Sequence, residues 1–122
     1  MELTKTEEDL MNHLWKMEKV FMKDLLEAYP DPKPAPSTVA TLLKRMHDKH
    51  FVGYTLYGKS REYYPLVKKK DYFSKHVNGL IKSFFNDSAT QFASFFTKST
   101  NLTKAELEDL KALIDSEIKK KP

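Results

Sequence analysis

The chain has 122 residues, a hydrophobic content of 40% and no cysteine. This length fits one domain, or a small domain with an oligomerisation segment, and the hydrophobic content suffices for a packed core. The lack of cysteine excludes disulfides, iron–sulfur clusters and thiolate metal sites, and it is compatible with a reducing cytoplasm. No signal-peptide pattern occurs, and the apolar runs are far shorter than the ~18 residues of a membrane span, so we expect a cytoplasmic protein.

The charge is distributed unevenly along the chain, although its net value is only +4. Counting Lys and Arg against Asp and Glu gives −4 for residues 1–32, +7 for residues 33–70 and +1 for residues 71–122. A concentrated positive field attracts phosphates and accelerates encounter with nucleic acid. An ordinary solvated basic surface has the same charge, so the motifs within residues 33–70 have to decide between the two interpretations.

The first 34 residues predict two short helices. Thr4 and Glu7 form a capping-box pattern at the start of the first helix, which should end near Met17. A bridging strand at residues 20–21 and a second helix over residues 22–29 follow, and the prolines of residues 30–34 stop this helix. The apolar residues expected to face inward are Leu10, Met11, Leu14, Trp15, Met22, Leu25, Leu26 and Tyr29.

A third helix is predicted to begin at Pro36, since proline fits the first helical position, where no amide donor is needed. Thr38, Thr41 and Arg45 share one of its faces, at the spacing i, i+3, i+7. Arginine can read guanine bidentately, threonine can contact a base or the thymine methyl, and the free amides at Ser37 and Thr38 suit a phosphate. An ordinary solvent face is the alternative. The apolar stripe of this helix consists of Val39, Leu42, Leu43 and Met46.

Two segments rich in strand-forming residues follow, residues 51–56 and 61–65, joined by a turn over residues 57–60. Basic residues near the turn would contact the DNA backbone or the minor groove and would position the protein without reading sequence. Any surface hairpin is the alternative. A helix suited to the major groove, followed by a basic wing, is typical of a winged helix-turn-helix, so sequence-specific DNA binding is our leading interpretation. The predicted DNA-binding residues are Ser37, Thr38, Thr41, Lys44, Arg45, Lys59, Ser60 and Arg61.

The C-terminal region, residues 71–122, predicts amphipathic helices, the last of which begins with a capping box at Thr103 and Glu106. Six phenylalanines fall between residues 73 and 96, which argues for a partner surface. The economical partner is a second copy, because a twofold dimer places two reading helices on palindromic half-sites. The alternative is that this region packs back on its own winged helix. The predicted dimer-interface residues are Phe73, Val77, Leu80, Ile81, Phe84, Phe85, Phe92, Phe95, Phe96, Leu107, Leu110 and Ile114.

Sequence motifs of catalysis are missing. No glycine-rich phosphate loop, nucleophile elbow, HExxH or paired-carboxylate motif occurs. His47 and His50 are expected at i, i+3 on one helix, where they could share a metal, but no cysteine or clear carboxylate partner accompanies them. We therefore predict a protein that is not an enzyme and that has no metal, no cofactor and no small-molecule substrate.

Several stretches together resemble the penicillinase repressor family, also called the BlaI/MecI/CopY family. They are Leu3–Glu8, the pair Leu14–Trp15, Pro34–Met46, Tyr63–Pro65 and Leu102–Leu110. The resemblance implies a mainly α protein with a small β wing, divided into a winged helix-turn-helix over residues 1–70 and a three-helix dimerisation region over residues 71–122. It also implies a homodimeric bacterial repressor on a palindromic operator.

The branches of this family differ in how they are induced. In the β-lactam branch, a membrane sensor protease system leads to cleavage at an Asn-Phe bond, and the matching position here is Phe95–Phe96, without the asparagine. In the copper branch, a C-terminal cysteine motif senses the metal, which this cysteine-free chain excludes. Cleavage between Ala89 and Lys98 would remove dimer contacts and with them the affinity gained by linking two half-sites.

Two functions from different classes therefore stand against each other. One is a dimeric, sequence-specific transcriptional repressor released by an unidentified signal. The other is a winged-helix protein-interaction module with no preference among DNA sequences, whose phenylalanine-rich region binds a different protein. Replacing Arg45 with alanine separates them, because only the first function predicts a larger loss on operator than on random DNA.

Overall fold

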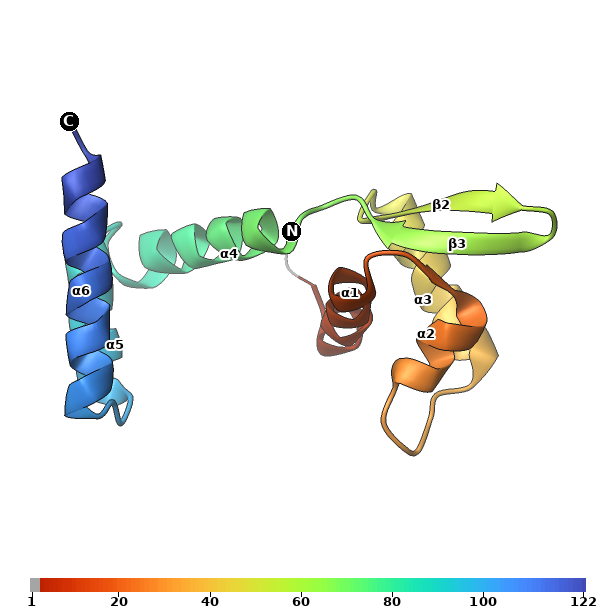
Figure 1. The fold of residues 1–122 in the computed structure, drawn as a ribbon, viewed down its shortest axis with the longest axis horizontal. Coiled ribbons are helices and arrows are strands. Elements are labelled where there is room, and N and C mark those ends of the chain that lie inside the picture. The colour runs from red at the N-terminus through yellow and green to blue at the C-terminus, as the bar shows by residue number, and fades with distance from the viewer. Residues whose placement is uncertain (1–2) are drawn as a thin grey trace. The chain divides into compact units, whose positions relative to one another are not determined.

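The computed structural model describes residues 3–122, and the chain forms two compact units that part between His76 and Val77. We call residues 3–76 the head and residues 77–122 the tail, and describe each by itself. The head contains α1 (Lys5–Met17), β1 (Val20–Phe21), α2 (Met22–Ala28), α3 (Pro36–Asp48), β2 (Val52–Tyr57), β3 (Ser60–Pro65) and the start of α4 (Lys69–Phe84) (Figure 1). The rest of α4, with α5 (Ala89–Ser99) and α6 (Lys104–Lys120), forms the tail.

The helix boundaries follow the local signals in the sequence. Thr4 caps α1 by accepting from the Glu7 amide at 3.2 Å, while Glu7 Oε1 accepts from the Thr4 amide at 2.9 Å, so the predicted capping box is confirmed. α3 begins with Pro36 at its first position, after Ala35 in extended conformation. The capping box expected at the start of α6 is also present, between Thr103 and Glu106.

The core of the head is built from α1, α2, α3 and the sheet. All four residues of the predicted α3 stripe are buried, as are the central apolar positions of α1 and Leu25 of α2. Tyr72 in the first turn of α4 joins this core with only 6% of its surface exposed. The first turns of α4 therefore pack with the head, a little beyond the residue 70 at which the sequence analysis ended it.

The sheet has three antiparallel strands in the order β1-β3-β2. β1 is the two-residue bridging strand that the sequence predicts, and it pairs Val20 with Tyr63 of β3. β2 and β3 form a hairpin in which Tyr57 pairs with Ser60, so the turn is the two residues Gly58 and Lys59. The turn lies where the sequence predicts it, but each strand extends one residue further into it, so the predicted four-residue loop is a two-residue loop. Gly58 has φ +62°, a conformation that glycine adopts without strain and that lets a two-residue hairpin turn form.

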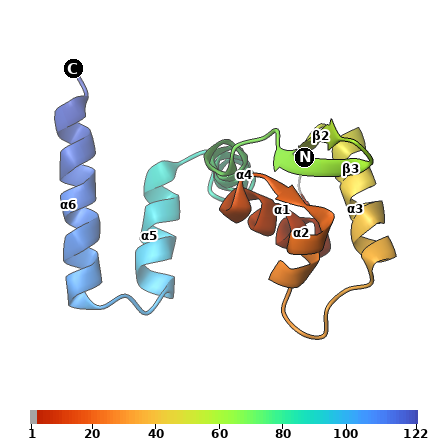
Figure 2. The same ribbon diagram turned by 45° about the vertical axis from the view of Figure 1, so that its right-hand side comes forward.

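The tail helices carry apolar side chains that the tail itself does not bury. α5 and α6 are joined by a short loop and run in opposite directions (Figure 2). Both helices lie wholly within the described residues, and neither contains a buried side chain. Within residues 3–122, no helix has the length and apolar character needed to cross a membrane.

Candidate DNA-binding surface

The outward side of α3 is polar and basic. At 100° per residue, Ser37, Thr41 and Lys44 lie opposite the buried stripe, and all three are exposed. The Thr41 hydroxyl donates to the Ser37 carbonyl at 2.9 Å, which leaves its oxygen lone pairs and its methyl group for a base. The Lys44 ammonium, whose side chain is 80% exposed, lies 3.5 Å from Asp48 in the last turn. This surface pair is weak, so Lys44 remains available to a phosphate.

Thr38 and Arg45 lie on the flank of α3 that faces α1. Arg45 is half-exposed, with 49% of its side chain accessible, and its Nη1 lies 3.8 Å from Oε2 of Glu7. At this distance the carboxylate attracts the guanidinium but does not form a hydrogen bond with it, so the five N–H donors of Arg45 are not used by Glu7. Thr38 is exposed. At 100° per residue, Thr38 and Arg45 therefore lie beside Thr41 on the polar surface of α3, on the side toward α1.

The other flank of α3 faces the wing across a groove of about 350 Å³. The Arg61 guanidinium lies 4.4 Å from the ring centre of Tyr54, within the range of a cation–π contact. The His47 ring lies 5.2 Å from the same Tyr54 ring. Sequence reasoning included Arg61 and missed Tyr54 and His47, because their proximity depends on how α3 packs against β2. The groove is lined by Ala40, Leu43, Lys44, His47, Asp48, Tyr54, Arg61 and Tyr63.

A second hollow, of about 420 Å³, lies on the other side of Arg61. Lys59, Ser60 and Arg61 line it from the wing, and Lys23 from the start of α2 adds a further cation. Sequence reasoning missed Lys23, which is distant in sequence from the wing. Arg61 therefore lines both hollows, one beside α3 and one beside the start of α2.

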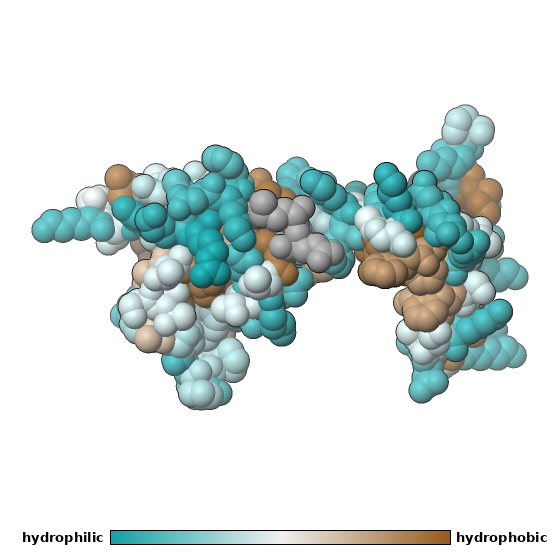
Figure 3. Space-filling view, turned by 180° about the vertical axis from the view of Figure 1, so that it is seen from behind, coloured by the Kyte–Doolittle hydropathy of each residue, from teal (hydrophilic) through white to brown (hydrophobic). Residues whose placement is uncertain are grey.

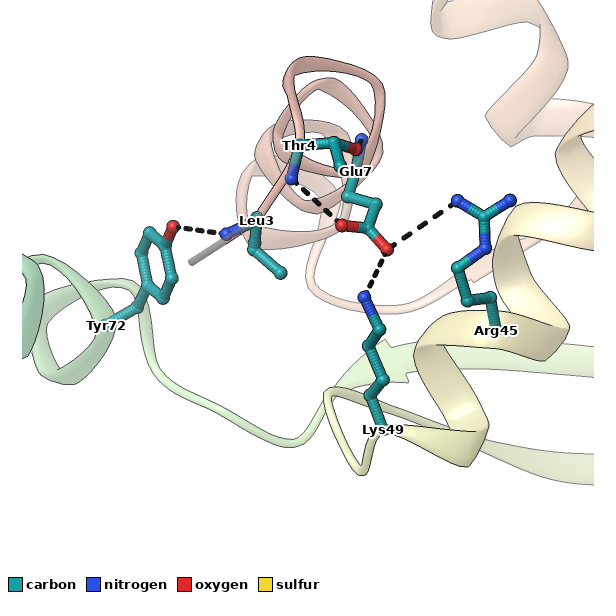
Figure 4. A network of polar contacts seen from close by, with 6 residues as sticks. All are labelled: Leu3, Thr4, Glu7, Arg45, Lys49 and Tyr72. Carbon is teal, nitrogen blue, oxygen red and sulfur yellow. Dashed lines mark hydrogen bonds and ion pairs between the residues drawn. The ribbon is translucent and has the colours of Figure 1, made fainter. Parts of the chain in front are cut away.

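One charged side chain is fully buried behind this surface. Glu7 has 0% exposure, and its Oε2 accepts from Lys49 Nζ at 2.7 Å (Figure 4). Burial by itself would raise the pKa of Glu7, but the hydrogen bonds from Lys49 and from the Thr4 amide outweigh it and hold that pKa below its ordinary value. Glu7 is therefore an anion paired inside the head. The sequence marked it as a capping residue and gave no sign of the contact with Lys49.

The histidine pair considered as a metal site does not form on one helix. His47 lies in the last turn of α3, but the helix ends at Asp48, and His50 has φ +66°, outside it. The expectation of an i, i+3 pair on one helix is wrong, because the chain leaves α3 to enter β2. Among residues 3–122, no group of three or more His, Cys, Asp or Glu side chains is placed to hold a metal ion.

The predicted dimer-interface residues are exposed or half-buried in the single chain. On the face that Figure 3 shows, hydrophobic side chains (brown) reach the surface of the molecule. Phe73 packs against Trp15 of the head, with the ring centres 6.0 Å apart. In the tail, the ring of Phe85 lies 5.4 Å from that of Phe92 and 5.4 Å from that of Phe95, so these three form a small aromatic cluster. Leu113 and Ile118, which the sequence analysis left out, are each 63% exposed beside Ile114.

Comparison with known proteins gives two findings. The model of the protein family described as "Penicillinase repressor" matches residues 3–116 of this chain. The chain is also similar to the solution structure of the DNA-binding domain of the repressor BlaI, with a TM-score of 0.52 and 21% sequence identity. That match covers 58% of this chain and 88% of the other, and at this identity it shows a shared fold. No curated protein matches the chain significantly.

Proposed function

This chain belongs to the penicillinase repressor family, a family of DNA-binding transcriptional repressors, and we propose that it represses transcription as a homodimer on a palindromic operator. The observation that carries the proposal is the surface formed by the outward side of α3 and the basic wing. Lys44 of α3 and Arg61 of the wing line one groove, and both come from the segment of the chain with charge +7.

In this proposal the residues of α3 read bases and those of the wing hold the backbone. Arg45 donates bidentately to a guanine, and Thr41 contacts a neighbouring base or thymine methyl. Lys44 binds a phosphate, and Lys59, Ser60 and Arg61 bind the backbone next to the groove. The contacts to phosphates supply most of the affinity and make it fall with salt, whereas the contacts of α3 supply sequence preference.

A second copy of the chain is the proposed partner of the tail. Phe84, Leu113, Ile114 and Ile118 are each more than half exposed, and surfaces with this many apolar side chains commonly mark interaction sites. A twofold dimer would cover them and would set two copies of α3 on half-sites about one helical turn apart.

The signal for release stays open, and tail proteolysis driven by a membrane sensor system is one route consistent with the proposal. Phe95 and Phe96 lie inside α5, so a protease would require this helix to unfold locally. α5 buries no side chain within the described tail, which lowers the free energy of such an opening in a single chain. We place the repressor in the cytoplasm, where its operator would be.

Fluorescence anisotropy tests the proposal with a labelled duplex taken from upstream of the chain's own gene and a scrambled duplex of equal composition. We expect tighter binding to the first duplex that persists near physiological salt. Equal and weak binding to both duplexes, lost on addition of salt, would contradict it. That result would favour the interaction module, in which the winged helix shows no DNA preference.

A further inference from the structure

We propose that Glu7 is a positioning residue for DNA reading, which sets the place of Arg45 through an ion-pair network buried behind α3. Lys49 forms the shorter ion pair with Glu7, at 2.7 Å. Arg45 forms the longer one, at 3.8 Å, and its N–H donors do not hydrogen-bond to Glu7. This inference rests on the proposed function, since it explains how the same surface acquires its sequence preference.

Glu7 is fixed on both of its carboxylate oxygens. Oε1 accepts from the Thr4 amide at 2.9 Å, and Oε2 accepts from Lys49 Nζ at 2.7 Å (Figure 4). The side chain is completely buried, so its rotamer is set by the packing of α1 against α3. A carboxylate in this position has to remain paired, because an unpaired buried charge is strongly destabilising.

Lys49 and Arg45 share the same oxygen but not equally. Lys49 follows the last residue of α3, and its side chain is only 29% exposed, at 2.7 Å. Arg45 lies one helical turn earlier, at 3.8 Å, with 49% of its side chain exposed. The shorter contact of Lys49 neutralises much of the charge on Oε2, and Arg45, at 3.8 Å, is beyond hydrogen-bond distance of that oxygen. Its guanidinium is thereby ordered before DNA arrives, and less conformational entropy is lost on binding.

The network extends to the first turn of α4. The Leu3 amide donates to the Tyr72 hydroxyl at 3.1 Å, and Tyr72 is buried in the head core. This bond fixes the residue that immediately precedes Thr4, the N-cap of α1 (Figure 4). The position of Glu7 therefore depends on contacts from α1, α3 and α4, three elements far apart in the sequence.

The test is Glu7→Gln in the full chain, assayed on operator and scrambled duplexes, with Glu8→Gln as the matched control. Both changes remove one negative charge from the first turn of α1, but Glu7 pairs with Arg45 and Lys49, whereas Glu8 forms no ion pair with α3 among the described residues. We expect Glu7→Gln to lower the operator-to-scrambled affinity ratio by about fivefold, the order of one immobilised side chain. Binding to the scrambled duplex should stay within about twofold of wild type, or rise, because a negative charge is lost. Circular dichroism and a thermal unfolding curve establish that each variant is folded.

A double variant separates positioning from general damage. On an Arg45→Ala background, Glu7→Gln should cause no further loss of the affinity ratio, because the residue it positions is gone. An undiminished fivefold loss on that background would overturn the inference, as would an unchanged ratio in folded Glu7→Gln. A wild type that shows no operator preference would instead overturn the proposed function itself.

Lys49→Met provides a second variant should Glu7→Gln fail to fold. It keeps the carboxylate and leaves Arg45 as the remaining cation of the pair, so Arg45 should be drawn toward Glu7 and away from DNA. We expect a lower affinity ratio, even though Lys49 is not on the outward side of α3. An unchanged ratio in this variant would also overturn the inference.

Discussion

The head and the tail share one sequence pattern, the amphipathic helix, but their apolar faces have different fates. In α3 all four residues of the apolar stripe are buried within the chain. In α6 the corresponding side chains remain exposed, with Leu113, Ile114 and Ile118 each above half of their full accessibility. The difference shows that helical periodicity identifies the apolar face of a helix but does not identify the surface that packs against that face. In the head the sheet and α1 cover the stripe of α3, whereas in the tail α5 and α6 bury no side chain.

The largest expected effect comes from opening a cavity in the head. Leu43→Ala removes a side chain that is 1% exposed and should lower the free energy of unfolding by about 2–5 kcal/mol. The matched change in the tail, Leu113→Ala at a position 63% exposed, should change the unfolding free energy of dilute, monomeric protein by less than about 0.5 kcal/mol. Urea unfolding measures both. Equal losses would mean that the tail is packed as tightly as the head in one chain.

The next effect concerns association of the tail. Ile114→Asp places a charge in the proposed interface and should weaken the dimer by about 2 kcal/mol, or roughly thirtyfold in dissociation constant. Sedimentation equilibrium over a range of concentrations gives this constant, and Lys119→Asp on the same helix serves as the control. If Ile114→Asp leaves the dissociation constant of the dimer unchanged, the interface lies elsewhere. An unchanged unfolding curve of the head in this variant would show that the two units unfold independently.

The next effect distinguishes base reading from nonspecific attraction of phosphates at two residues of α3, Arg45 and Lys44. Arg45→Ala should cost about 1–3 kcal/mol on operator and much less on random DNA, because a bidentate contact is lost. Lys44→Ala should weaken both duplexes alike and reduce the slope of log affinity against log salt by about one. Anisotropy titrations at several salt concentrations compare the two variants. An equal loss on both duplexes for Arg45→Ala would exclude direct base reading by this residue.

The smallest effect is a dependence of head stability on acid. Because the pKa of Glu7 lies below its ordinary value of 4.5 in the folded chain, the unfolded chain takes up the proton more readily. The stabilisation is therefore present in full above pH 4.5 and is lost as the pH falls through the lower, folded pKa. Urea unfolding from neutral pH into this range should show a steeper decline for wild type than for Glu7→Gln. Parallel declines would mean that the Glu7 carboxylate is not stabilised by folding.

Local signals predicted the local parts of this structure. The capping boxes at Thr4 and Thr103, the start of α3 at Pro36 and the buried stripe of α3 depend on neighbours within one or two helical turns, and each is confirmed. The penicillinase repressor resemblance and the winged-helix fold are likewise confirmed.

Features that depend on distant residues were missed or mistaken. The hairpin turn is two residues rather than four because Tyr57 pairs with Ser60, which strand register decides. The contact between Glu7 and Lys49 joins residues separated by 42 positions, and no pattern in α1 or at the end of α3 predicts it. The groove between α3 and Tyr54 depends in the same way on how a helix packs against a strand. The residues assigned to the dimer interface and to DNA contact stay predictions.

The most direct test of the account is the number of chains bound to one operator duplex. Analytical ultracentrifugation of the full chain with a labelled duplex from upstream of its gene would give the mass of the complex. We expect two chains per duplex, because in the proposed dimer each head reads one half-site and the tails join the two copies. A complex containing a single chain, at concentrations where the duplex is saturated, would contradict it.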